Sequence, residues 1–220
     1  MKNNFNKNHE AKNKTGSELI LYGRHAVISA LKNPERKIKK LVISPDNREE
    51  IETLNLNITP TIIDKKDFNK FLPQDAVHQG FALYCNRLEN TPLEDLIASS
   101  ENKTQCHILI LDQVTDPQNI GAIIRSCAAF NTLGLIMQDK NSPLESGAMA
   151  KAAAGTMEFV PISRVTNLNR AIEKLKEAGF WIIGMDGYAK TSLDKLDKSG
   201  KIAVIMGSEG KGMRRLVEEN

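Results

Sequence analysis

Short apolar runs alternate with helix-like stretches over most of the chain. In its first third, apolar positions recur at helical spacing over residues 25–31. Strand-like apolar runs, some rich in β-branched side chains, occupy residues 41–44, 58–63 and 81–85. This alternation predicts a small α/β domain over residues 17–86.

A polar stretch separates this domain from a second one. Residues 87–105 have the composition of a linker, apart from one short helical piece at 93–98. Beyond it come continuous apolar runs, which are typical of parallel strands covered on both faces. These runs are residues 107–111, 133–137, 180–185 and 202–206, and helix-like segments lie between them at 119–130, 146–155 and 168–178. Residues 106–220 are therefore predicted to form βαβ units with a mainly parallel sheet.

Composition excludes several classes of protein. Residues 1–16 are rich in Asn and Lys, which predicts a disordered basic tail rather than a secretory signal. The three cysteines are widely spaced and show no C-x-x-C pairing, so neither a disulfide framework nor a metal site is expected. No apolar run has the length of a membrane span. We therefore expect a cytoplasmic protein without a bound metal.

The positive charge is concentrated in the N-terminal part. Residues 1–85 hold 14 Lys and Arg against 10 Asp and Glu, whereas the remainder holds 16 against 17. The densest basic cluster is Lys32, Arg36, Lys37, Lys39 and Lys40. Such a cluster favours a polyanion through phosphate contacts. A solvated helix face and loop would have the same composition.

The turn after the strand at 107–111 carries candidate chemistry. Asp116 is a suitable N-cap and Pro117 a suitable first residue of a helix. Gly121 inside that helix costs about 1 kcal/mol relative to Ala, which indicates that something approaches its backbone closely. Asn119 and Arg125 are six residues apart and therefore not on one face of the helix. An ordinary amphipathic helix with a solvated Arg also fits this pattern.

A second turn follows the strand at 202–206. Three glycines surround Glu209 in the segment G-S-E-G-K-G, residues 207–212. A glycine-rich loop between a strand and a helix exposes backbone groups to a nucleotide-like ligand. The segment matches neither the P-loop nor the G-x-G-x-x-G pattern. A plain glycine-rich connection with a solvated Glu209 is the alternative.

Together these residues resemble the SpoU/TrmH family of RNA ribose 2′-O-methyltransferases, within the SPOUT superfamily. The first motif of that family is matched by residues 119–126 (N-I-G-A-I-I-R-S), and the second by residues 205–216 (I-M-G-S-E-G-K-G-M-R-R-L). Further segments are similar to the branch that methylates a guanosine in 23S rRNA; they are residues 22–27, 76–80, 111–117 and 164–168. The resemblance covers residues 18–220.

The resemblance implies a fold, a reaction and a set of site residues. It implies a ribosomal-protein-like RNA-binding domain, then a SPOUT α/β-knot methyltransferase domain that uses S-adenosylmethionine and forms a homodimer. In the implied active site Arg125 stabilises the reacting 2′-oxygen, aided by Asn119 and Glu209. Met206, Gly207 and Gly187 would line the cofactor. RNA contacts are expected from Arg24, His25, Lys37, Lys39 and Lys40.

The chain departs from the family pattern at its end. Family members continue into a third motif that completes the cofactor pocket and the knot, whereas this sequence stops at Asn220. We therefore expect a C-terminally truncated domain with an incomplete knot. The alternatives are a catalytically impaired RNA-binding remnant, a tRNA 2′-O-methyltransferase, or another nucleotide-using α/β enzyme.

Overall fold

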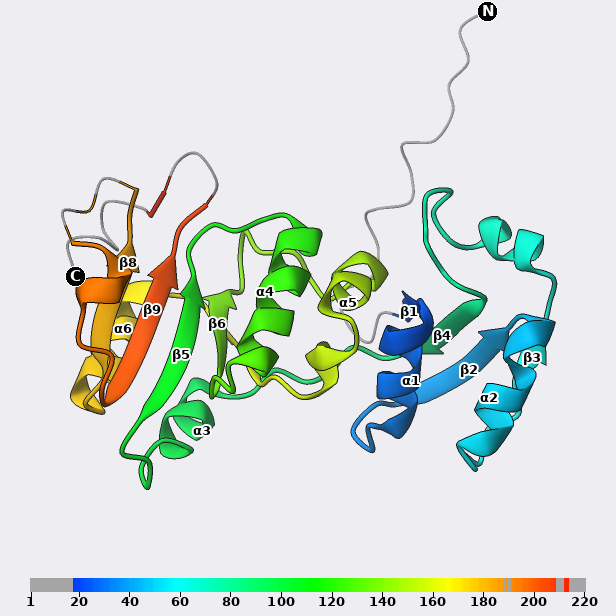
Figure 1. The fold of residues 1–220 in the computed structure, drawn as a ribbon, viewed down its shortest axis with the longest axis horizontal. Coiled ribbons are helices and arrows are strands. Elements are labelled where there is room, and N and C mark those ends of the chain that lie inside the picture. The colour runs from blue at the N-terminus through cyan, green and yellow to red at the C-terminus, as the bar shows by residue number, and fades with distance from the viewer. Residues whose placement is uncertain (1–17, 188, 190, 209–211, 214–220) are drawn as a thin grey trace, which may run out of the picture.

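The computed structural model describes residues 18–187, 189, 191–208 and 212–213. Within these ranges the chain forms two sheets that lie side by side in Figure 1, each with its own helices.

The first sheet has four strands in the order β1-β4-β2-β3. β4 is antiparallel to β1 and β2, and its side chains are almost wholly buried because it lies between them. Helix α1 buries Ala26, Val27, Ala30 and Leu31, whose spacing places them on one face. The elements of this part are β1 (Leu19–Tyr22), α1 (Arg24–Lys32), β2 (Ile38–Ile43), η1 (Pro45–Asn47), α2 (Arg48–Thr53), β3 (Thr61–Ile62), η2 (Lys65–Lys70) and β4 (Phe81–Cys85).

The second sheet has five parallel strands in the order β7-β6-β5-β9-β8. All five carboxyl ends therefore meet at one edge, which is the upper edge in Figure 1. The elements of this part are α3 (Leu93–Ala98), β5 (Cys106–Leu111), α4 (Pro117–Ala129), β6 (Gly134–Gln138), α5 (Gly147–Ala153), η3 (Thr156–Glu158), β7 (Ile162–Val165), α6 (Leu168–Glu177), β8 (Trp181–Met185), η4 (Leu193–Lys195) and β9 (Lys201–Met206).

Alternate side chains of the central strand β5 enter two different cores. Ile108 and Ile110 pack with α3 and α6, whereas Leu111 packs with α4 and α5. The core on the α4–α5 side continues into the first domain, where it includes Leu21 of β1 and Val27 of α1. The two domains consequently share one apolar core across their junction.

These observations confirm the predicted α/β class with a parallel second sheet. Helices α1, α3, α4, α5 and α6 lie where the pattern predicts them. The strand predicted over residues 58–63 is reduced to Thr61–Ile62, because it follows Pro60 and lies at an exposed sheet edge. The pattern gives no sign of α2 or β7. The predicted tail at 1–16 lies outside the described residues, and so does most of the segment on which the predicted knot depends.

Candidate functional site

The predicted cofactor residues lie at the carboxyl edge of the parallel sheet. Met206 ends β9 and has Leu111 of β5 on one side and Met185 of β8 on the other. The backbone N–H of Asp112 donates to the Met206 carbonyl at 2.9 Å, which extends the sheet by one more bond. Gly187 lies two residues beyond β8 at the same edge. Met206, Gly207 and Gly187 are thus brought to one edge of the sheet, where parallel sheets bind ligands.

The loop after β9 closes on itself. Ser208 and Gly212 exchange two backbone hydrogen bonds of 3.0 Å. A Cβ on Gly207 would overlap the backbone of Gly212, so only glycine fits there. Glu209, a predicted catalytic residue, lies outside the described residues.

The side chains at this edge of the sheet are of a kind that can bind S-adenosylmethionine. Met206 is half-buried, and Met185 is 40% exposed on the same face of the sheet. These two side chains offer apolar surface to an adenine ring, and Gly207 has no side chain that would obstruct a ligand at this edge. The residues present therefore fit the cofactor that the sequence predicts.

Helix α4 begins as the sequence predicts. The Asp116 side chain accepts a hydrogen bond from Gln118 N at 3.0 Å, and Pro117 occupies the first turn. Gly121 faces α5, where a Cβ would overlap the Met149 carbonyl oxygen and lie 2.7 Å from the Ala152 Cβ. The close approach that Gly121 indicates is therefore made by a neighbouring helix.

Asn119 and Arg125 both have exposed side chains. Asn119 lies in the first turn, near the carboxyl edge of the sheet. Arg125 lies six residues later, which is about 9 Å further along the helix axis and away from that edge. Among the described residues, Arg125 has no hydrogen-bond or ion-pair partner. The structure does not bring Arg125 to the Met206 edge of its own chain.

The predicted RNA-binding residues fall into two groups at opposite ends of the first domain. Arg24 and His25 begin α1, next to the start of β4. Lys37, Lys39 and Lys40 lie at the start of β2, beside the end of β4, with their side chains exposed. In the first group, Arg24 pairs with Glu50 at 2.5 Å.

The first group has a neighbour that the sequence does not predict. Lys151 of α5 donates to the Gln79 side-chain oxygen at 2.6 Å, and Arg24 N donates to the same oxygen at 3.2 Å. Burial lowers the pKa of Lys151. Residues from both domains therefore meet at the start of α1.

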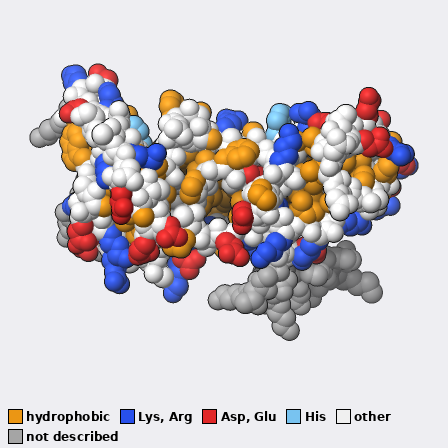
Figure 2. All heavy atoms as spheres, turned by 90° about the horizontal axis from the view of Figure 1, so that it is seen from below, with side chains coloured by type: hydrophobic (Ala, Val, Ile, Leu, Met, Phe, Trp, Pro, Cys, Tyr) orange, Lys and Arg blue, Asp and Glu red, His pale blue; other side chains and the backbone are white. Residues whose placement is uncertain are grey.

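One member of the predicted basic cluster does not lie on the surface. Arg36 has a fully buried side chain, bonded to Glu145 and Glu158 of the second domain. It is therefore closed to RNA, and this part of the basic-cluster prediction is wrong. On the face that Figure 2 shows, basic side chains are interspersed with acidic ones.

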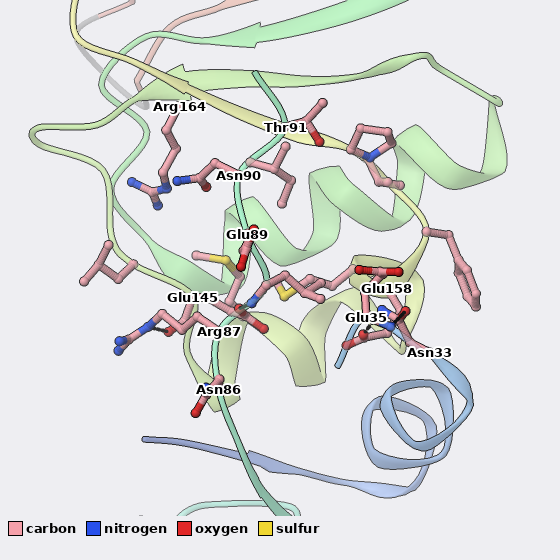
Figure 3. Close-up of a pocket in the computed structure, with 18 of the residues that line it drawn as sticks. Asn33, Glu35, Asn86, Arg87, Glu89, Asn90, Thr91, Glu145, Glu158 and Arg164 are labelled. Carbon is pink, nitrogen blue, oxygen red and sulfur yellow. Dashed lines mark hydrogen bonds between the residues drawn. The ribbon is translucent and has the colours of Figure 1, made fainter. Parts of the chain in front are cut away.

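A cavity of about 670 Å³ lies between the two domains, beside residues 86–91 (Figure 3). Its walls include Asn33 and Glu35 from the first domain and Glu145 and Arg164 from the second. Of the predicted catalytic and cofactor residues that the structure describes, none lines it. We therefore place the candidate active site at the carboxyl edge and not in this cavity.

Among the residues that the structure describes, no group of three or more His, Cys, Asp or Glu side chains could hold a metal ion. None of the described helices combines the length and the apolar character that crossing a membrane requires.

Both parts of the chain match family profiles. Residues 107–220 match the SpoU rRNA Methylase family, and residues 20–91 match the RNA 2′-O ribose methyltransferase substrate binding family.

Individual relatives agree with the profiles. An RlmB from Coxiella burnetii, named a 23S rRNA (guanosine-2′-O-)-methyltransferase, is 33% identical over 90% of this chain and 82% of its own. An uncharacterized tRNA/rRNA methyltransferase from Synechocystis is 34% identical over 91% of this chain, which spans 54% of that relative's length. In fold, the chain is similar to an AdoMet-bound rRNA methyltransferase from Sinorhizobium meliloti, with a TM-score of 0.74, 22% identity and coverage of 92% and 75%.

Proposed function

We propose, from the premise that the chain belongs to the SpoU rRNA methylase family, that it methylates a ribose 2′-hydroxyl of RNA with S-adenosylmethionine as the donor. The observation that carries this proposal is the glycine loop after β9, held beside Met206 at the carboxyl edge of the parallel sheet. The proposed substrate is a guanosine in 23S rRNA. This specificity is supported by the Coxiella relative, whose name gives that reaction. An enzyme with this substrate is expected in the cytoplasm.

The bound cofactor would supply a methyl group on a positively charged sulfur, with a neutral leaving group. The protein must then align the ribose and stabilise charge on its 2′-oxygen. Arg125 suits the second task because its guanidinium stays protonated and is exposed. Asn119 and Glu209 are proposed to orient Arg125 or the RNA.

A homodimer accounts for the distance between Arg125 and the Met206 edge. If the active site lies between two copies, Arg125 of one copy can reach the cofactor edge of the other. Exposed apolar side chains support such a contact. Phe130 at the end of α4 is 79% exposed, and Trp181 on β8 is 48% exposed.

The RNA contacts are proposed at the two ends of the first domain. Arg24 and His25 would act with Lys151 at the start of α1, and Lys37, Lys39 and Lys40 at the start of β2. Lysine and arginine contacts to phosphates would make binding strongly dependent on salt.

Methyl transfer tests this proposal directly. The purified chain is incubated with labelled S-adenosylmethionine and either undermodified 23S rRNA or tRNA, and the variant Arg125→Ala is run in parallel. We expect label in 23S rRNA, its loss in Arg125→Ala, and cofactor affinity within about threefold of the parent by calorimetry. Label on tRNA alone would refute the proposed substrate. RNA binding without any cofactor binding would favour a catalytically impaired remnant.

A further inference from the structure

Arg36 is a buried cation at the junction of the two domains. It follows α1 in the first domain, and its side chain is fully buried. Its Nη2 donates to one oxygen of Glu158 at 2.6 Å, and its Nε donates to the other at 3.2 Å. The same Nη2 lies 2.7 Å from a Glu145 oxygen, and Nη1 donates to the Asn86 carbonyl at 2.9 Å. A two-bond pair of this kind fixes direction as well as distance.

Three separate parts of the chain meet on this one guanidinium. Glu158 ends η3 and Glu145 precedes α5, so both belong to the second domain, whereas Asn86 begins the connecting segment. Each carboxylate has a further donor. Asn33 Nδ2 donates to Glu158 at 2.7 Å, and Leu88 N donates to Glu145 at 2.9 Å. The ion pairs therefore hold both domains and the connection between them.

Burial alone would lower the pKa of Arg36, but hydrogen bonds and charge from Glu158 and Glu145 outweigh it and raise the pKa. The guanidinium consequently stays charged. Removing this guanidinium while the domains stay together would leave two carboxylates unpaired at a buried junction, which is strongly unfavourable.

Elsewhere at the junction, the backbones of the two domains also lie close to each other. A Cβ on Gly147 of α5 would lie 2.5 Å from the Ile20 carbonyl oxygen of β1. Gly155 has φ +89°, and a Cβ there would lie 2.8 Å from the His25 carbonyl oxygen of α1. Backbones of the two domains thus approach each other directly at two places.

The connecting segment itself is less tightly packed. The cavity of about 670 Å³ lies along residues 86–91, as Figure 3 shows for Asn86, Arg87 and Glu89. The position of the first domain is therefore fixed by direct contacts between the domains, with Arg36 as their charged centre.

We propose that Arg36 is a positioning residue, which locks the RNA-binding domain at one angle to the methyltransferase domain and so delivers the target ribose to the active site. This inference rests on the proposed function for its catalytic consequence. The locking of the domains can be tested without catalysis.

The distance between the domains is measured by electron spin resonance on the full chain. Spin labels are attached at Glu49→Cys in α2 and Glu173→Cys in α6, two exposed positions. The three native cysteines are buried, so labelling is selective for the introduced ones. The labelled chain is mixed with an excess of unlabelled chain, so that distances between two copies of a dimer do not contribute, and we expect one narrow distance distribution for the parent.

Two variants remove the ion pairs between the domains in different ways. Arg36→Met leaves the carboxylates unpaired. Arg36→Met/Glu145→Gln/Glu158→Gln also removes their charge, which keeps a folded protein available if the first variant unfolds. The control is Arg48→Met, which breaks an exposed arginine–glutamate pair with Glu52 inside the first domain.

We expect the distribution to become at least twice as broad in the triple variant and unchanged in Arg48→Met. On RNA, we expect kcat to fall by about 100-fold. The KM for RNA and the affinity for S-adenosylmethionine should stay within about threefold of the parent values. A purely stabilising role would instead lower every activity in proportion to the folded fraction.

A distribution that stays narrow in the triple variant overturns the proposal. If the parent transfers no methyl group to any RNA, the proposed function fails, and the distance measurement still decides whether Arg36 locks the domains.

Discussion

Gly121 gives a sharp test of the contact between α4 and α5. In the substitution Gly121→Ala, helix propensity alone stabilises the protein by about 1 kcal/mol. The structure opposes this gain, because the new Cβ would lie 2.7 Å from the Ala152 Cβ and would overlap the Met149 carbonyl oxygen. Carbon atoms in contact prefer about 3.5–4.0 Å, so the helices must separate by about 1 Å.

Overpacking of this kind costs about 1–3 kcal/mol. Both of the nearest groups belong to α5 itself, one of them to its backbone, so they cannot rotate away, and we take the upper part of that range. The expected net effect of Gly121→Ala is a loss of about 1–2 kcal/mol in the free energy of unfolding. The shift of α4 should also reduce methyl transfer, because Arg125 lies one turn further along the same helix.

Urea unfolding followed by circular dichroism measures this effect. The control is Gln118→Ala, an exposed position in the first turn of α4, which should change the free energy of unfolding by less than about 0.5 kcal/mol. If Gly121→Ala stabilises the protein by about 1 kcal/mol, the close packing of α4 on α5 is refuted.

Two further predictions concern titratable groups. Burial, followed by the charges of Lys65 and Lys151, lowers the pKa of His78, so the unfolded chain binds a proton more readily. The free energy of unfolding should therefore decrease as the pH falls below about 6.5, and equally steep curves for the parent and His78→Asn would contradict this assignment. Burial raises the pKa of Cys85 to about 12. It should resist iodoacetamide at pH 8 until urea unfolds the chain, as mass spectrometry of its peptide would show; rapid labelling of folded protein would count against its burial.

The sequence predicts most of the fold because periodicity reports burial directly. The helix at α4 is marked by Asp116, Pro117 and its apolar spacing, and all of these signals are local. β7 is missed because Ser163 and Arg164 interrupt its apolar pattern at an edge of the sheet. Edge strands need less apolar surface than central ones, so their pattern is weaker.

The candidate site is predicted less completely than the fold. The second motif places Met206 and Gly207 at the end of a strand, and because the sheet is parallel this end lies at its carboxyl edge; their contact with a cofactor stays a prediction. Arg36 resembles an RNA-binding residue in sequence, yet its burial depends on Glu145 and Glu158, more than 100 positions away. The role of an isolated charge is decided by partners that no local pattern reveals.

The chemical identity of the product tests the central claim most directly. Undermodified 23S rRNA is treated with the purified chain and S-adenosylmethionine, digested to nucleosides and analysed by mass spectrometry. The account predicts 2′-O-methylguanosine, formed with the parent and absent with Arg125→Ala. A methyl group found on a base, or no methylated nucleoside although the cofactor binds, would contradict it.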